Sequence, residues 1–110
     1  MPDDLDNVWK ALSDPTRREI LDVLREGPQQ TGELVARFPS LSRVGVIKHI
    51  EVLRQASLVL TREDGRRRIN SLNPVPIQQI YQRWVRGFEG HWAGVLADLT
   101  KLGGQPGLKP

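Results

Sequence analysis

The stretch LSRVGVIKHIEVLRQASLV, residues 41–59, constrains the fold more than any other part of the chain. Val46, Ile50 and Leu53 recur at the spacing of one helical face, and Ser42 is a residue type that commonly caps a helix N-terminus. The residues away from this apolar stripe combine basic and aliphatic side chains: Arg43, Val44, Ile47 and Lys48. The stretch therefore predicts a helix with one buried face and one exposed face whose composition suits contact with another molecule.

The segments before this helix carry their own start and stop signals. Apolar and acidic residues predict a first helix over about residues 4–12. Asp14 followed by Pro15 predicts the start of a second helix, which should end at the Gly-Pro pair of residues 27–28. A third helix is expected to begin near Thr31, where we find no full capping box. The third and fourth helices together then form a helix–turn–helix.

The sequence after these helices changes to β character. Two β-favouring runs flank Asp64-Gly65, a pair typical of a type I′ hairpin turn, and a two-residue turn there would pair Leu60 with Ile69. One long helix with a regular apolar stripe is expected over residues 75–102, followed by a flexible tail over residues 103–110.

The order of these elements predicts one domain, residues 1–102, with the winged helix-turn-helix fold. It should be mainly α with a small β-hairpin wing, in the order α-α-α-α-β-β-α. In this arrangement the second helix of the helix–turn–helix and the hairpin wing are the two parts that are free to touch a partner.

Positive charge is concentrated in those two parts. Residues 43–68 contain seven Lys and Arg against three Asp and Glu, whereas the whole chain has a net charge of only +3. A helix–turn–helix places its second helix in the major groove and its first across the DNA backbone, and a basic wing suits phosphates or the minor groove. The predicted contacts with double-stranded DNA are therefore Thr31, Ser42, Arg43, Val44, Ile47, Lys48, Arg62, Arg66, Arg67 and Arg68.

Plainer explanations of these basic residues stay open. A helix with a basic outer face is often only a solvated helix, and charged residues such as Arg66 to Arg68 can serve to stop edge strands from aggregating. Glu63 and Asp64 also dilute the positive charge of the wing. The combination of helix–turn–helix and basic hairpin in this order favours DNA binding over these alternatives.

Three blocks of the sequence resemble the ArsR-type winged-helix repressors, in the subset without metal ligands. The blocks are ALSDPTRREILDVLREGP, GELVARFPSLSRVGVIKHIEVLRQASLV and GRRRINSLNP. The resemblance implies a transcriptional regulator and adds His49 to the groove contacts. The chain departs from the family pattern at Ile47, where a small hydroxyl residue is usual, at Ser57, where Gly is usual, and at Asn70, where Tyr is common.

The sequence also argues against several kinds of site. It has no cysteine, which excludes disulfides and thiolate metal sites, and its two histidines are far apart, which argues against a metal site at Glu89 and His91. No constellation of catalytic groups is present, so we expect neither an enzyme nor a cofactor. Without a signal sequence or a membrane-spanning run, a cytoplasmic location is expected. The sequence does not indicate an effector.

Five of the six aromatic residues lie in the two terminal helices. A small core cannot enclose both helices, and aromatic residues are enriched at interfaces, so we expect a homodimer. The predicted interface residues are Leu5, Val8, Trp9, Trp84, Phe88 and Trp92. Packing of the last helix on the first within one chain is the alternative. For the protein as a whole, the alternative is a winged-helix module that dimerises without reading DNA.

Overall fold

The computed structural model describes residues 5–101, excluding the side chains of residues 88, 89 and 91–93. The helices are α1 (Asp6–Leu12), α2 (Pro15–Arg25), α3 (Thr31–Arg37), α4 (Arg43–Gln55), α5 (Val75–Ile80) and α6 (Glu89–Lys101). The strands are β1 (Gln29–Gln30), β2 (Val59–Asp64) and β3 (Arg67–Leu72). The chain forms two compact units, one ending at Ile77 and the other beginning at Gln78, and each is described by itself. The predicted tail, residues 103–110, lies outside the described residues.

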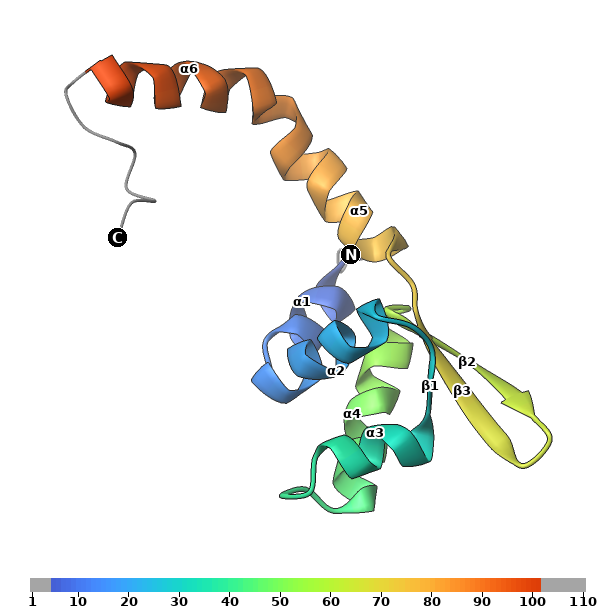
Figure 1. Ribbon diagram of the computed structural model, residues 1–110. Helices are drawn as coiled ribbons and strands as arrows, with labels where there is room; N and C mark the ends of the chain where they lie inside the picture. The colour runs from blue at the N-terminus through green and yellow to red at the C-terminus, as the bar shows by residue number, and fades with distance from the viewer. Residues whose placement is uncertain (1–4, 102–110) are drawn as a thin grey trace. The chain divides into compact units, whose positions relative to one another are not determined.

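The first unit has the predicted winged helix-turn-helix fold. Helices α1 to α4 pack together, and the hairpin formed by β2 and β3 projects from them (Figure 1). The core is made of aliphatic side chains from the four helices, the turn after α4 and the start of β2: Val8, Ala11, Ile20, Leu21, Leu24, Leu34, Val46, Ile50, Leu53, Leu58 and Val59. The buried stripe predicted for the fourth helix, Val46, Ile50 and Leu53, is therefore confirmed.

The corner between α1 and α2 is held by hydrogen bonds that residues 14–18, the DPTRR segment, make to each other and to the end of α1. The Asp14 carboxylate accepts from the backbone N–H of Arg17 at 3.1 Å, which caps α2 as predicted. The side chains of Arg17 and Arg18 donate to the last carbonyls of α1, to Ala11 at 2.8 Å and to Leu12 at 2.6 Å. These guanidinium groups satisfy carbonyls that have no partner inside the helix, so this segment fixes how α1 meets α2.

Helix α3 begins with a cap that we did not foresee. The Glu33 carboxylate accepts from the backbone N–H of Gln30 at 2.8 Å, as the acidic member of a capping box does. The residues just before α3 form β1, which pairs antiparallel with β3, Gln29 opposite Asn70 and Gln30 opposite Ile69. The sheet thus has three strands in the order β1-β3-β2, and the predicted two-stranded hairpin was incomplete.

The hairpin turn is shifted from its predicted position. Asp64 pairs with Arg67, so Gly65 and Arg66 form the two-residue loop, and Leu60 lies opposite Ser71 rather than Ile69. Gly65 has a φ of +63° and Arg66 has no positive φ, which is the pattern of a type II′ turn rather than the predicted type I′. The shift makes Asp64 the last residue of β2 and leaves Arg66 at the tip.

Helix α4 begins at the cap that the sequence indicated. The Ser42 hydroxyl accepts from the backbone N–H of Gly45 at 3.0 Å. A Cβ at Gly45 would lie 3.2 Å from the Ser42 Oγ, so glycine keeps this cap uncrowded. Ser57, just beyond the helix, has a φ of +59°, the left-handed conformation for which glycine is the usual residue.

The continuous last helix that we expected is interrupted. After α5, a π-helical turn covers Tyr81–Val85 and a 3-10 turn covers Arg86–Phe88, and only then does α6 begin. The apolar stripe is regular over this whole range, so periodicity alone gave no sign of the change in hydrogen bonding. No helix in the described part of the chain is long and apolar enough to cross a membrane.

Candidate nucleic-acid interface

The outer face of α4 carries the side chains that the sequence singled out. Val44 is 62% exposed and Ile47 is 38% exposed, although Val46, in the same two turns, is fully buried. Arg43 and Lys48 are exposed as well. Two aliphatic and two basic side chains therefore share the accessible surface of one helix. This surface can offer methyl groups and charged donors to the same partner.

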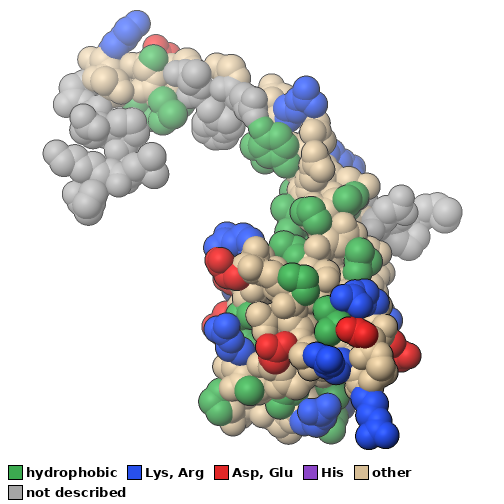
Figure 2. All heavy atoms as spheres, turned by 45° about the vertical axis from the view of Figure 1, so that its right-hand side comes forward, with side chains coloured by type: hydrophobic (Ala, Val, Ile, Leu, Met, Phe, Trp, Pro, Cys, Tyr) green, Lys and Arg blue, Asp and Glu red, His purple; other side chains and the backbone are tan. Residues whose placement is uncertain are grey.

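The hairpin provides a second basic surface. Arg62 lies on β2, Arg66 is in the turn, and Arg67 and Arg68 begin β3, and all four side chains are exposed. In Figure 2, which turns the wing toward the reader, Lys and Arg side chains gather over the lower part of the molecule, with apolar and a few acidic side chains between them. The wing and α4 belong to the same compact unit.

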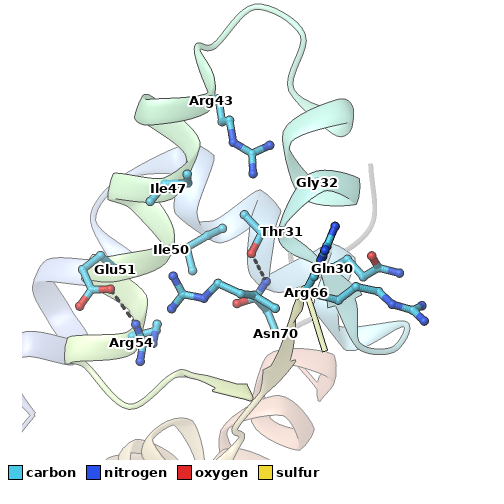
Figure 3. A pocket seen from close by; sticks show the side chains of 12 residues that line it. Gln30, Thr31, Gly32, Arg43, Ile47, Ile50, Glu51, Arg54, Arg66 and Asn70 are labelled. Carbon is cyan, nitrogen blue, oxygen red and sulfur yellow. Dashed lines mark hydrogen bonds and ion pairs between the residues drawn. The ribbon is translucent and has the colours of Figure 1, made fainter. Parts of the chain in front are cut away.

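A cleft of about 280 Å³ lies between the helix–turn–helix and the hairpin. We call it the basic cleft. Of the predicted site residues, it brings together Thr31, Arg43, Ile47, Arg66, Arg67 and Arg68. Figure 3 shows Arg43 extending from α4 into the space that faces Thr31 and Gly32. The cleft joins residues that the sequence assigned separately to the recognition helix, to the helix before it and to the wing.

Asn70 forms the floor of the basic cleft and was missed as a functional candidate. Its side chain is fully buried in the chain. The amide oxygen accepts from the Thr61 hydroxyl at 2.8 Å, and the amide nitrogen donates to the Gln29 carbonyl at 3.2 Å and to the Thr31 hydroxyl at 3.1 Å. One side chain thereby joins β1, β2, β3 and the start of α3. The departure from the family pattern at this position was the only available signal.

The charge of the cleft lining is strongly positive. Five arginines line it and only one acidic residue, Glu51. Glu51 is held by Arg54, with 3.0 Å between the carboxylate and the guanidinium. Such an exposed pair adds little stability, but it removes the one carboxylate from competition for the other arginines. The remaining arginines are therefore available to an anion.

His49 lies apart from the cleft. Its Nδ1 is 3.2 Å from the guanidinium of Arg17, in the first turn of α2, and 3.9 Å from the carboxylate of Asp14, the residue that caps α2. Since a guanidinium can only donate, the contact with Arg17 uses Nδ1 as an acceptor in the neutral ring, whereas a protonated ring would pair with the Asp14 carboxylate instead. Burial raises the pKa of the Asp14 carboxyl, but the Arg17 backbone N–H and the charges of His49 and Arg17 outweigh it and leave that pKa lowered. The DNA contact expected of His49 stays a prediction, and only its Nε2 edge is available for it.

The residues predicted for a dimer interface differ in exposure. Leu5 and Val8 are 6% and 2% exposed, so they are already covered in the single chain, whereas Trp9 and Trp84 are 45% and 41% exposed. The side chains of Phe88 and Trp92 lie outside the described residues, as do those of Glu89 and His91, the metal site that we argued against. Elsewhere in the described chain, no group of three metal-ligating residues is found.

The chain is similar to known helix–turn–helix proteins. Residues 12–62 match a family described as a helix-turn-helix domain. The chain is 38% identical to the HTH-type transcriptional regulator Rv2034 of Mycobacterium tuberculosis, over 78% of this chain and 83% of that one. It is 34% identical to the transcriptional repressor SdpR of Bacillus subtilis, over 76% and 91%. The solved structure of an ArsR-like transcriptional regulator from Rhodococcus sp. RHA1 has a TM-score of 0.69 at 29% identity, with 91% and 90% covered.

Proposed function

Because the chain belongs to the ArsR family of helix–turn–helix transcriptional regulators, we propose that it is a homodimeric repressor that binds a palindromic operator in double-stranded DNA. The main observation that supports this proposal is the composition of the outer face of α4. That helix buries Val46 and Ile50 and leaves Val44 and Ile47 exposed beside basic residues, on the unit that also bears the basic wing.

In this proposal α4 lies in the major groove. Arg43 and Lys48 donate to guanine or to phosphate, and the methyl groups of Val44 and Ile47 contact thymine methyls. Helix α3 crosses the DNA backbone, and the hairpin arginines bind the neighbouring phosphates or the minor groove. The base contacts determine which sequence is bound, and the phosphate contacts position the protein on it.

The direct test begins with selection of bound duplexes from a random library by the full chain. Affinity for the selected duplex is then measured over a salt series for the wild type, Arg43→Ala and Lys48→Ala. Loss of a bidentate base contact costs about 1–3 kcal/mol, and loss of a phosphate contact lowers the slope of log affinity against log salt by about 1. Arg25→Ala removes the same charge from the exposed last turn of α2 and serves as the control.

We expect both α4 variants to bind more weakly and the control to bind like the wild type. Equal affinity of all four proteins at every salt concentration would remove α4 from the interface. A wild type that binds no duplex in a salt-dependent way would instead favour the winged-helix interaction module.

Exposed apolar side chains in the second unit support the homodimer. Tyr81, Trp84, Val85, Leu96 and Leu99 are each between 39% and 44% exposed. Apolar groups of this size gain free energy when another surface covers them. A two-fold dimer would place its two recognition helices about 34–36 Å apart, one turn of DNA, so the operator would be a palindrome.

The assembly is tested by sedimentation at micromolar concentration. We expect a dimer for the wild type and a monomer for Trp84→Glu, because a carboxylate would be stranded in an apolar layer. Gln82→Glu, which adds the same charge to an exposed neighbouring residue, should stay dimeric. DNA affinity of Trp84→Glu should fall by far more than tenfold, since the two half-sites are no longer linked. A monomeric wild type that binds one half-site tightly would contradict the dimer.

Repression is tested with a reporter gene whose promoter overlaps the selected operator. Production of the wild type should lower expression, and production of Lys48→Ala should lower it much less. Increased expression with the wild type would identify an activator instead.

A further inference from the structure

The basic cleft offers hydrogen-bond donors almost exclusively. Arginine side chains only donate, five of them line the cleft, and the one carboxylate is held by Arg54. The floor and the α4 wall add Ile50 and Ile47, which compete for no polar ligand. A group that suits this lining is small, negatively charged and rich in acceptor oxygens.

The hydrogen bonds of Asn70 leave one further donor in the lining of the cleft. Both N–H groups of Asn70 are used, by the Gln29 carbonyl and the Thr31 hydroxyl, and its oxygen is used by Thr61. Because the Thr31 oxygen accepts from Asn70, its own hydrogen remains available to a ligand. Thr31 lines the basic cleft, whereas Thr61 does not. The buried amide thus holds the Thr31 oxygen in place, and its hydrogen bond is drawn in Figure 3.

We propose that the basic cleft is a phosphoryl-binding site in which the Thr31 hydroxyl, held in place by Asn70, donates to a phosphoryl oxygen. Asn70 is a positioning residue in this site, since it acts on the ligand through Thr31. Arginine forks match the geometry of phosphate oxygens, and charge-assisted hydrogen bonds are the strong ones.

Two sources could supply the phosphoryl group, a backbone phosphate of DNA or a free phosphoryl compound. The DNA backbone is the better match, because Arg43 and Ile47 belong both to this cleft and to the α4 surface that enters the groove in the proposed function. This assignment rests on that function. Bound in this way, a backbone phosphate would connect α3, α4 and the wing and would position the recognition helix along the duplex.

The test compares two substitutions that remove a hydroxyl without changing shape. Thr31→Val and Thr61→Val each take one partner from Asn70, so a merely structural role predicts similar losses of stability and of DNA affinity. The proposal predicts a loss of affinity of about tenfold for Thr31→Val, the effect of one hydrogen bond to a charged group, and of less than about twofold for Thr61→Val. Thr31→Ser restores the hydroxyl and should restore the affinity.

The source of the phosphoryl group is identified with two probes. The first is a series of duplexes with one neutral methylphosphonate at each backbone position in turn. At one position the methylphosphonate should lower the DNA affinity of the wild type. On that duplex Thr31→Val should bind as tightly as the wild type, because the contact that it lacks is already lost. The second probe is inorganic phosphate or pyrophosphate added to the DNA-free protein and followed by amide chemical shifts, for which we expect only millimolar affinity.

Two results would overturn the proposal, and two others would overturn only DNA as the source of the phosphoryl group. Equal loss of affinity in Thr31→Val and Thr61→Val would make the hydroxyls structural. Unchanged affinity of Thr31→Val, with Lys48→Ala still weakened, would exclude the cleft while leaving the proposed function intact. Micromolar binding of pyrophosphate without any effect of methylphosphonates would overturn DNA as the source and assign the cleft to a small phosphoryl compound. If the wild type binds no duplex at all, the proposed function fails first, and the backbone assignment fails with it.

Discussion

Replacing Asn70 by aspartate should make the stability of the first unit depend steeply on pH. Asn70→Asp keeps the shape of the side chain but exchanges its two N–H donors for an oxygen. At neutral pH the new carboxylate would be fully enclosed and would face the Gln29 carbonyl and the Thr31 oxygen, both of which accept from the amide in the wild type. A buried charge that keeps only the Thr61 hydroxyl as a donor is strongly unfavourable, so the folded protein should bind a proton there.

The size of the effect follows from that proton. The charge-related penalty cannot exceed the cost of protonating a carboxyl whose ordinary pKa is about 3.9, which at pH 7 is about 4 kcal/mol. A neutral carboxyl has one O–H in place of two N–H groups, so one acceptor loses its donor at a cost of about 1 kcal/mol. The total loss is about 5 kcal/mol at pH 7, comparable with the whole stability of a small domain.

The sign of the pH dependence separates this mechanism from ordinary damage. The new carboxyl has a raised pKa in the folded state, so the penalty is absent below the unfolded pKa and grows above it by about 1.4 kcal/mol per pH unit, until the folded pKa is passed. The assay is urea unfolding of the variant and the wild type between pH 4 and pH 7, compared as a difference at each pH. If the variant is unfolded at pH 7, acidification should refold it.

Asn73→Asp is the matched control. The Asn73 amide also donates to a backbone carbonyl, that of Ser57 at 2.8 Å, but in an exposed hydrogen bond. Its oxygen accepts from the Val75 N–H, a bond that a carboxylate keeps. We expect a loss below about 1 kcal/mol with little pH dependence. A loss at residue 70 that is equal at pH 4 and pH 7 would refute the enclosure of Asn70 in a hydrogen-bonded floor.

The remaining predictions concern capping, the αL residue and metals. Asp14→Ala should lose about 1 kcal/mol by urea unfolding, whereas Asp14→Asn, which retains the cap, should lose less. Because the folded pKa of Asp14 is lowered, its charge stabilises the wild type above the ordinary carboxyl pKa, and this contribution disappears as the pH falls through the folded pKa, so the wild type and Asp14→Asn should converge in acid. Ser57→Gly should raise the free energy of unfolding by up to about 1 kcal/mol, since it relieves a left-handed φ, and an unchanged melting temperature would contradict this. Zinc at micromolar concentration, followed by a chelator, should leave DNA affinity unchanged, and a reversible tenfold change would direct attention to Glu89 and His91.

Much of the helix–turn–helix could be predicted because its signals act over a few residues. Asp14 and Ser42 cap the helices that follow them, and both caps are formed by atoms three residues away. The buried faces of α2 and α4 follow from the helical repeat alone. The exposed mixture of Val44, Ile47 and Lys48 follows from the same repeat, so the candidate recognition surface was also available from the sequence.

The tertiary structure decided what depends on residues far apart in the chain. Strand β1 has only two residues and exists through its pairing with β3, about forty positions later. Asn70 resembles an exposed strand residue until Gln29 and Thr31 surround its amide, 41 and 39 residues away. Likewise, only packing turns His49 toward α2. Local periodicity places a side chain on a face, whereas a hydrogen bond between distant segments requires the fold to bring both partners together, and that is why the basic cleft emerged only in three dimensions.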